Sequence, residues 1–432
     1  MKKKEKEKVE KKLLYDTNEK PPIGKWIMLS LQHVFAMFGA TVLVPILVNQ
    51  QAGMEVLSIP VALVTSGIGT LIYILCTKGK SPVYLGSSFA FIGPIVAASI
   101  NGGVSSFVTG IVAVGLIYCI FALLIKIFGK GWINKLLPPI VVGPMIIIIG
   151  LSLASSAVSN AGLVDGGSWK PIVISLFTFF VTSFVSLKAK GFIKIIPFLV
   201  GITAGYILAI ILGEVNFDAI SSASIIEVPK FLLPIRDYTF SLTGLLTIAP
   251  IAFVTIAEHI GDHMALSKII DKDLINDPGL EKTLLGDGLA TATAGLLGGP
   301  ANTTYGENTS VVGMTKVASV WVIGLAAIMA IIIGFFGQVT AVISTIPSCV
   351  LGGVSLLLYG FIAVNGLKVI VNNQIDFEDT RNVIIASAML VLGLGGAVIT
   401  IATANISVAI SGMSLAAIIG IILNLILPKT NK

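Results

Sequence analysis

Charged residues are scarce in this sequence of 432 residues. Asp, Glu, Lys and Arg make up 12% of the chain, whereas hydrophobic residues make up 55%. A soluble globular domain carries about 25% charged residues, so the composition excludes an ordinary water-soluble fold. The lipid bilayer is therefore the expected solvent for most of the chain.

Cysteine is also rare. Cys76, Cys119 and Cys349 stand singly within apolar stretches. Their spacing fits neither a disulfide framework nor a zinc ribbon, and we expect all three to be small packed core residues. We expect the protein to need no cofactor.

The first 25 residues lack the apolar core of a cleavable signal peptide. They hold nine lysines against five acidic residues, which predicts a solvated, partly disordered cytoplasmic tail over residues 1–25. The net charge of +6 comes mainly from this tail and from short loops. Such a distribution indicates membrane topology and no nucleic-acid-binding face.

Long apolar runs fill the rest of the chain. They predict an all-α polytopic membrane protein with about fourteen transmembrane segments. The expected segments are 27–48, 58–77, 83–101, 104–125, 136–158, 171–187, 194–213, 239–267, 283–299, 302–315, 317–341, 345–367, 382–401 and 405–427.

The loops alternate in charge. Counted from a cytoplasmic N-terminus, the even loops carry lysines, whereas the odd loops are nearly free of cations. The exceptions are Lys170 and the mixed stretch 214–238, which we expect to be an extracellular loop. Short cationic loops face the cytoplasm, so we expect a multi-pass protein of the bacterial cytoplasmic (inner) membrane with both termini inside.

Two segments are short, polar and broken by glycine. The third begins at Tyr84–Pro94 and the tenth at Asn302–Ser310. They occupy the same place in two sets of seven, and because seven is odd the second set crosses in the opposite sense. This pattern predicts two inverted seven-segment repeats with discontinuous helices, whose irregular backbone lies in protein or along a cavity. The alternative is two ordinary helices weakened by glycine.

Few ionisable residues fall within the predicted segments, and such residues are functional candidates. Glu258 and Asp262 share one helix face through their i, i+4 spacing, and Glu307 opens the tenth segment beside Gly306. Carboxylates that converge on one low-dielectric site cannot all stay ionised. We therefore expect one to be protonated near neutral pH, as a proton-coupled carrier requires.

A protonated carboxyl group presents a donor beside an acceptor, which is complementary to a cyclic amide or imide. Two such groups, with free backbone N–H groups at Phe89 and Gly306, would match the polar edge of a small base. Glu258 has an alternative role as a helix cap or lysine partner. Glu307 and Asp262 have similar structural alternatives.

The histidines have structural alternatives as well. His33 is equally consistent with a hydrogen-bonded packing role. His259 and His263 lie on a face turned away from the carboxylates, where helix packing is expected. Their i, i+4 spacing can hold zinc, but the order Glu-His-x-x-Asp-His differs from that of a zinc protease. Asp287 was expected near the membrane interface and is left unassigned.

Four stretches are similar to motifs of the nucleobase–ascorbate transporter family, with the closest likeness to its bacterial uracil permeases. The resemblance runs from about residue 25 to residue 428. The stretches are Gln32–Pro45, Gly86–Phe91, Ala257–Gly261 and Asn302–Asn308.

This resemblance implies two domains that move against each other, often within a homodimer. A core would comprise residues 26–130 and 239–341, and a gate would comprise 131–213 and 342–428. Segments three and ten would each carry a short extended strand near the midplane.

The resemblance also implies roles for single residues. Glu258 and Glu307 would bind two edges of the base, with backbone groups of Phe89 and Gly306 beside them. The remaining residues with an implied role are Ala40, Tyr305 and Tyr359, which would line the pocket, and His33, which would support it.

The sequence departs from the uracil permease pattern at one position. Asp262 stands where those proteins have a histidine, and purine carriers of the family commonly have aspartate there. Those carriers usually have glutamine where this chain has Glu307. We therefore expect proton-coupled uracil uptake, with Asp262 as the proton relay. The alternatives are a xanthine or uric acid symporter, an anion transporter of the same fold, and a non-transporting sensor.

Overall fold

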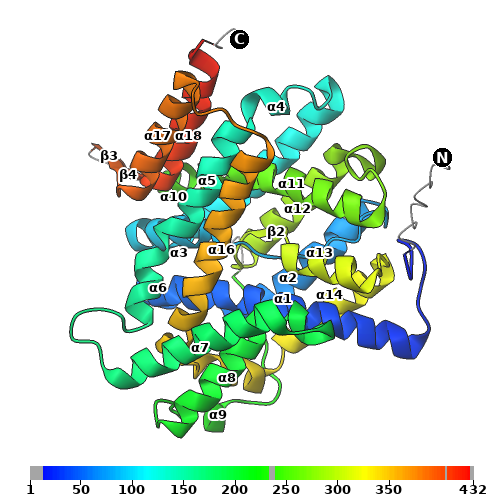
Figure 1. Cartoon of the computed structure of the whole chain (residues 1–432), viewed down its shortest axis with the longest axis vertical. Helices are drawn as coiled ribbons and strands as arrows, with labels where there is room; N and C mark the ends of the chain where they lie inside the picture. The colour runs from blue at the N-terminus through cyan, green and yellow to red at the C-terminus, as the bar shows by residue number, and fades with distance from the viewer. Residues whose placement is uncertain (1–12, 233–238, 404–405, 429–432) are drawn as a thin grey trace, which may run out of the picture.

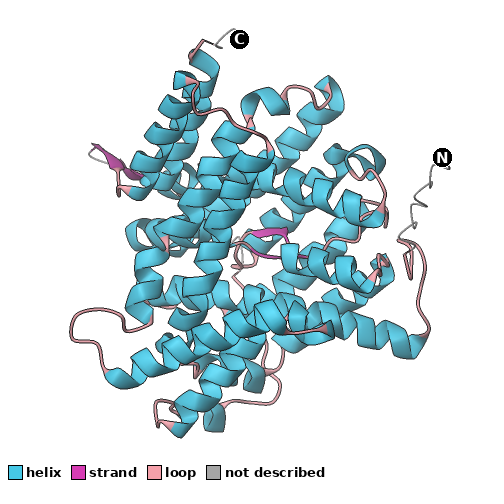
Figure 2. Ribbon diagram, viewed as in Figure 1, coloured by secondary structure: helices cyan, strands magenta, loops and turns pink. Residues whose placement is uncertain are grey.

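The computed structural model describes residues 13–232, 239–403 and 406–428, and these form a bundle of helices with two small strand pairs (Figures 1 and 2). In the first half of the chain the helices are α1 (Ile23–Ala52), α2 (Ile59–Cys76), α3 (Ile92–Phe128), α4 (Ile133–Leu136), α5 (Pro139–Ser152), α6 (Ala154–Asn160), α7 (Trp169–Lys188), α8 (Pro197–Ile211) and α9 (Asp218–Ser222).

In the second half the helices are α10 (Leu242–Ile248), α11 (Ala252–Ile270), α12 (Leu280–Leu296), α13 (Gly306–Thr315), α14 (Val320–Gly334), α15 (Gly337–Ser344), α16 (Ser348–Asn372), α17 (Thr380–Leu394) and α18 (Gly412–Ile426). The strands are β1 (Leu85–Ser87), β2 (Asn302–Thr304), β3 (Val398–Thr403) and β4 (Ile406–Ser411).

Helical stretches long and apolar enough to cross a bilayer number seven in the part of the chain that the structure describes. Four further apolar helices, α8, α14, α17 and α18, are shorter. The chain is therefore a multi-pass helical membrane protein, as the composition predicted. The count of fourteen crossings and the inverted repeat stay predictions.

The helices pack in two groups. In the first, α12 lies against α2 and α3, and α14 lies against α1 and α2. In the second, α16 packs against α5 and α7, and α17 packs against α5 and α18. The groups combine segments from both halves of the chain. The division into a core and a gate, and the movement of one against the other, stay predictions.

Strands β1 and β2 pair antiparallel at the centre of the bundle, and this confirms the predicted extended segments (Figure 2). Gly86 lies opposite Thr303, and a Cβ atom on Gly86 would come within 2.5 Å of the Tyr305 ring. This close approach explains why the first strand contains glycine. The side chain of Ser66 on α2 donates to the Leu85 carbonyl oxygen at 2.7 Å, so α2 satisfies part of the buried backbone.

The expected boundary at 102–103 coincides with a break in α3 at Gly103, whose φ is 63°. Two other predicted boundaries were wrong. The segment expected at 317–341 divides into α14 and α15.

The second error concerns the segments predicted at 382–401 and 405–427. α17 stops at Leu394 before Gly395 and Gly396, and the hairpin of β3 and β4 occupies 398–411 instead of helix. Two consecutive glycines end the helix, and the β-branched residues that follow favour an extended chain.

The N-terminal region is also more ordered than predicted. Residues 1–12 and 233–238, within the predicted tail and extracellular loop, lie outside the described residues. Residues 13–22 form a strap that runs along the connection between α13 and α14. The Leu14 amide donates to the Lys316 carbonyl oxygen at 2.7 Å, and the Ala318 amide donates to the Tyr15 carbonyl oxygen at 2.9 Å. Part of the expected solvated tail is therefore packed on the bundle.

Candidate functional site

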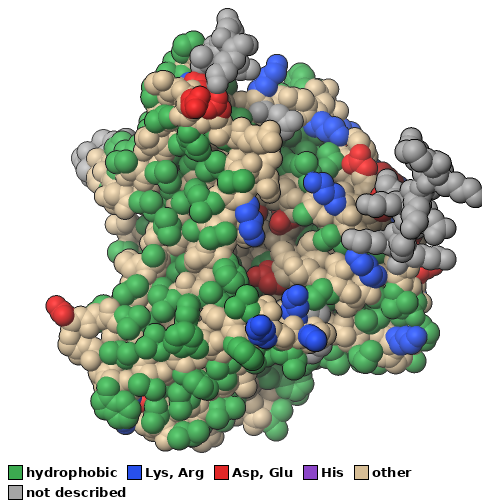
Figure 3. Space-filling view, viewed as in Figure 1, with side chains coloured by type: hydrophobic (Ala, Val, Ile, Leu, Met, Phe, Trp, Pro, Cys, Tyr) green, Lys and Arg blue, Asp and Glu red, His purple; other side chains and the backbone are tan. Residues whose placement is uncertain are grey.

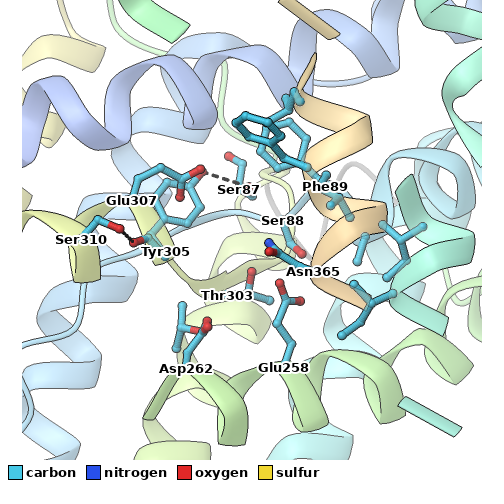
Figure 4. A pocket seen from close by; sticks show the side chains of 18 of the residues that line it. Ser87, Ser88, Phe89, Glu258, Asp262, Thr303, Tyr305, Glu307, Ser310 and Asn365 are labelled. Carbon is cyan, nitrogen blue, oxygen red and sulfur yellow. Dashed lines mark hydrogen bonds between the residues drawn. The ribbon is translucent and has the colours of Figure 1, made fainter. Parts of the chain in front are cut away.

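A cavity of about 380 Å³ lies where the paired strands turn into helices (Figure 4). β1 leads through a short 3₁₀ turn, Phe89–Phe91, into α3, and β2 leads into α13 at Gly306. The first N–H groups of a helix have no partner within the helix, so both turns offer free donors. The lining residues are Ser87, Ser88, Phe89, Ala90, Ile146, Ile149, Phe198, Glu258, Asp262, Thr303, Thr304, Tyr305, Gly306, Glu307, Ser310, Leu358, Phe361, Ile362 and Asn365.

Three carboxylates share this cavity. Glu258 and Asp262 come from α11, and Glu307 comes from the first turn of α13. Figure 4 shows the two α11 side chains on one side of the cavity and Glu307 on the opposite side. All three are half-buried. The structure thus brings together the acidic residues that the sequence singled out.

Asp262 is held by a residue that sequence reasoning missed. The Thr304 hydroxyl at the end of β2 donates a hydrogen bond to an Asp262 carboxylate oxygen. This hydrogen bond holds the Asp262 side chain against the strand pair through one carboxylate oxygen. The second carboxylate oxygen of Asp262 takes no part in this bond. Thr304 had no signal of its own in the sequence, because only the pairing of β1 with β2 brings it beside α11.

Glu307 is positioned by its neighbour Asn308. The Asn308 side-chain nitrogen lies 3.1 Å from the His33 carbonyl oxygen and 3.1 Å from His33 Nδ1. His33 is 1% exposed and lies behind the cavity, so its contact with the site runs through Asn308. A neutral imidazole accepts at Nδ1 when its proton is on Nε2, which lets one amide group satisfy both contacts.

The other predicted residues differ in placement. Phe89, Tyr305 and Gly306 line the cavity, and Ala40 lines a smaller adjoining cavity that Phe89 and Glu307 share. Tyr305 is 4% exposed, and its hydroxyl donates to the Ser87 carbonyl oxygen at 2.9 Å. Tyr359 lies in the apolar core at 2% exposed, outside the set of described lining residues.

Behind the cavity, a buried polar cluster joins α11 to its neighbours. His259 Nδ1 lies 2.8 Å from Asp287 Oδ2, and His259 Nε2 lies 3.0 Å from the Thr283 hydroxyl, both on α12. His263 contacts the Tyr73 hydroxyl on α2. Both histidines thus have the packing role expected of them. Asp287, left unassigned from the sequence, is fully buried and lies in hydrogen-bond contact with His259.

The cavity opens on one face of the molecule. Figure 3 shows acidic side chains at the floor of a hollow and lysine or arginine side chains around its rim. A hollow with acidic side chains therefore lies on this face of the molecule.

Comparison with known proteins places the chain among membrane carriers. Residues 24–402 match the model of a family described as the permease family. The chain belongs to this family. It is 48% identical to the uracil permease of Bacillus subtilis (strain 168) over 98% of this chain and 97% of the relative. It is 41% identical to the uracil permease of Escherichia coli (strain K12) over 95% and 92% of the two chains.

Solved structures with the same fold include two anion carriers. The transmembrane domain of the cyanobacterial bicarbonate transporter BicA aligns with a TM-score of 0.60 at 16% identity, over 93% of this permease and 98% of that chain. Murine Solute Carrier 26 family member A9 aligns with a TM-score of 0.62 at 11% identity, over 94% and 68% of the two chains. At this identity the likeness extends to the fold alone.

Proposed function

We propose that this permease imports uracil together with protons across the bacterial cytoplasmic membrane by alternating access. The observation that carries the proposal is the meeting of Glu258 and Glu307, from two different helices, across one cavity at the ends of the paired strands. The relatives named uracil permease match nearly the whole chain and support the substrate.

The chemistry of the cavity suits a pyrimidine base. Uracil carries alternating N–H and C=O groups around its ring, so it needs acceptors and donors in alternation. Glu258 and Glu307 supply acceptors, and the backbone N–H groups near Phe89 and Gly306 supply donors. The ring of Phe89 offers an apolar surface for the face of the base. A volume of about 380 Å³ lies within the range of small-molecule pockets.

The same carboxylates support proton coupling. Like charges in a site of low dielectric repel one another, so at least one of Glu258, Asp262 and Glu307 is expected to hold a proton when the cavity is closed. In this proposal Asp262 relays the proton, and the hydrogen bond from Thr304 holds the Asp262 side chain in position. Exposure of the site to each side in turn would then load and release the proton with the base.

The pairing of helices supports alternating access. The acidic side chains belong to the group of helices around α3 and α12, whereas α5, α8 and α16 contribute an almost wholly apolar wall. An apolar wall forms few hydrogen bonds with the acidic side chains opposite. The helices around α3 and α12 can therefore move against those around α16 with little loss of hydrogen bonding.

A xanthine or uric acid symporter is the second candidate, because Asp262 occupies the cavity at the position where purine carriers commonly have aspartate. An anion transporter is disfavoured, because three carboxylates would face the anion. Uptake into proteoliposomes under an imposed proton gradient separates these functions. The proposal expects labelled uracil to accumulate and unlabelled xanthine to compete weakly, whereas a sensor would accumulate neither.

A further inference from the structure

The two walls of the cavity differ sharply in chemistry. The wall formed by β1, β2, α11 and α13 carries hydroxyls and carboxylates, beside the backbone N–H groups with which the Phe89–Phe91 turn and α13 begin. Among the described lining residues, the opposite wall is apolar except for one side chain, Asn365 on α16. The apolar members of that wall are Ile146, Ile149, Phe198, Leu358, Phe361 and Ile362.

Lys368 contacts the Asn365 side chain, and both side chains are exposed. The Lys368 ammonium group lies 3.3 Å from Asn365 Oδ1, one turn along α16. A lysine ammonium group has donors only, so the atom that it contacts must be the amide oxygen. The planar amide then directs its NH₂ group away from Lys368. Figure 4 shows Asn365 within the cavity, in the same view as Ser88, Thr303 and Glu258.

From this geometry we propose that Asn365 is a specificity-determining residue that donates a hydrogen bond to a ring carbonyl oxygen of the bound base. This inference rests on the proposed function and adds a contact from the apolar wall. Glu258 and Glu307 accept from the N–H groups of the base, and Asn365 donates to a carbonyl that the base turns toward α16. The bound base would then link the two walls through one hydrogen bond on the α16 side.

The contact selects against bases that lack the carbonyl. Among the described lining residues Asn365 is the one polar side chain of this wall, and it is exposed in this structure. A bound base would displace water from its NH₂ group, so a base without an acceptor at that edge would leave this group unpaired. An unpaired donor in such a place costs more than the hydrogen bond gains. Asn365 therefore recognises the substrate by donating to its carbonyl oxygen, while the carboxylates accept hydrogen bonds from its N–H groups.

The test compares uracil with 2-thiouracil and 4-thiouracil, in which sulfur replaces one carbonyl oxygen and accepts hydrogen bonds weakly. Purified full-length protein in nanodiscs binds labelled uracil, and each compound competes. The variants are Asn365→Leu, which keeps the side-chain bulk without a donor, and Asn365→Ala. We expect each variant to bind uracil about tenfold more weakly. Each should also lose the preference for oxygen over sulfur at one ring position and keep it at the other.

Asn372→Ala is the matched control, because this asparagine is exposed at the last turn of the same helix. It should match the unmodified protein in affinity and preference. Lys368→Met frees the amide to rotate and should reduce the preference at the same ring position as Asn365→Leu. If Asn365→Leu keeps both the affinity and the two preferences, the inference is wrong. If the unmodified protein binds no uracil, the proposed function fails instead.

Discussion

The Asn308 side chain on α13 binds His33 on α1 through two contacts of 3.1 Å, one to the His33 carbonyl oxygen and one to its Nδ1 atom. Asn308 directly follows Glu307 in the first turn of α13. The contacts therefore tie the helix that carries a substrate-facing carboxylate to α1, and His33 influences the cavity without lining it.

Replacement of Asn308 by alanine should loosen this tie. Because the side chain is 1% exposed, loss of its bonds should lower stability by about 1–3 kcal/mol. Displacement of Glu307 should weaken uracil binding by roughly tenfold. Thermal unfolding and equilibrium binding measure the two effects. Asn101→Ala is the control, because the Asn101 side chain is exposed and donates within its own helix to the Ala97 carbonyl oxygen at 2.8 Å. Equal binding by both variants would contradict the positioning role.

Gly86 in β1 and Gly306 at the start of α13 should respond differently to alanine. A Cβ atom on Gly306 meets no atom within 4 Å, and this residue lines the cavity. Gly306→Ala should therefore fold normally and bind uracil poorly, because the methyl group occupies space meant for the base. A Cβ atom on Gly86 would clash with the Tyr305 ring at 2.5 Å, so Gly86→Ala should lower the melting temperature. The prediction is contradicted if Gly306→Ala binds normally.

Asp262→Asn should separate binding from accumulation. The amide keeps the shape of the side chain but cannot carry a proton, so uracil binding should remain measurable while accumulation against a gradient is lost. Thr304→Val removes the hydrogen bond to Asp262 and should lower the transport rate without abolishing coupling. Uptake and counterflow in proteoliposomes distinguish the two outcomes. Concentrative uptake by Asp262→Asn would exclude this residue as the relay.

The attachment of the N-terminal strap, residues 13–22, should contribute to stability through a pair of opposite charges. Lys272 Nζ lies 2.5 Å from Asp16 Oδ1, and this hydrogen bond holds the pKa of the Asp16 carboxyl below its usual value of 3.8. The pair therefore contributes to stability above about pH 3.8 and loses its contribution as pH falls through the lowered pKa. Both side chains are more than one-third exposed, so the contribution should be about 0.2–1 kcal/mol.

Asp16→Asn tests this contribution by thermal unfolding. The variant should be slightly less stable than the unmodified protein at pH 7, and the two should converge only in strong acid. Asp218→Asn, in the exposed α9, serves as the control. A difference that vanishes already at pH 6 would point to another group.

The membrane class, most helices and the meeting of the acids were predictable from sequence, because each depends on local composition or on a repeated pattern. Hydrophobic length predicted α1, α2 and α16, and the family resemblance implied the short strands β1 and β2. The contact of Thr304 with Asp262 and the place of Asn365 on the cavity wall were not predictable, because they depend on which elements face one another. The buried position of Asp287 was missed for the same reason, since its partner His259 lies on another helix.

The β3–β4 hairpin was missed because its apolar residues read equally well as helix or strand. Periodicity alone cannot separate a short buried strand from a helical segment. The glycine pair at 395–396 was the local signal that α17 ends there.

Proton movement during uracil uptake tests the central claim most directly. Proteoliposomes that enclose a pH-sensitive dye would receive uracil on the outside, with no imposed gradient and with potassium and valinomycin present to clamp the membrane potential. The account predicts that the lumen acidifies as uracil enters, and that Glu258→Gln and Glu307→Gln abolish both signals. Uptake of uracil at the full rate with no change in luminal pH would contradict the account.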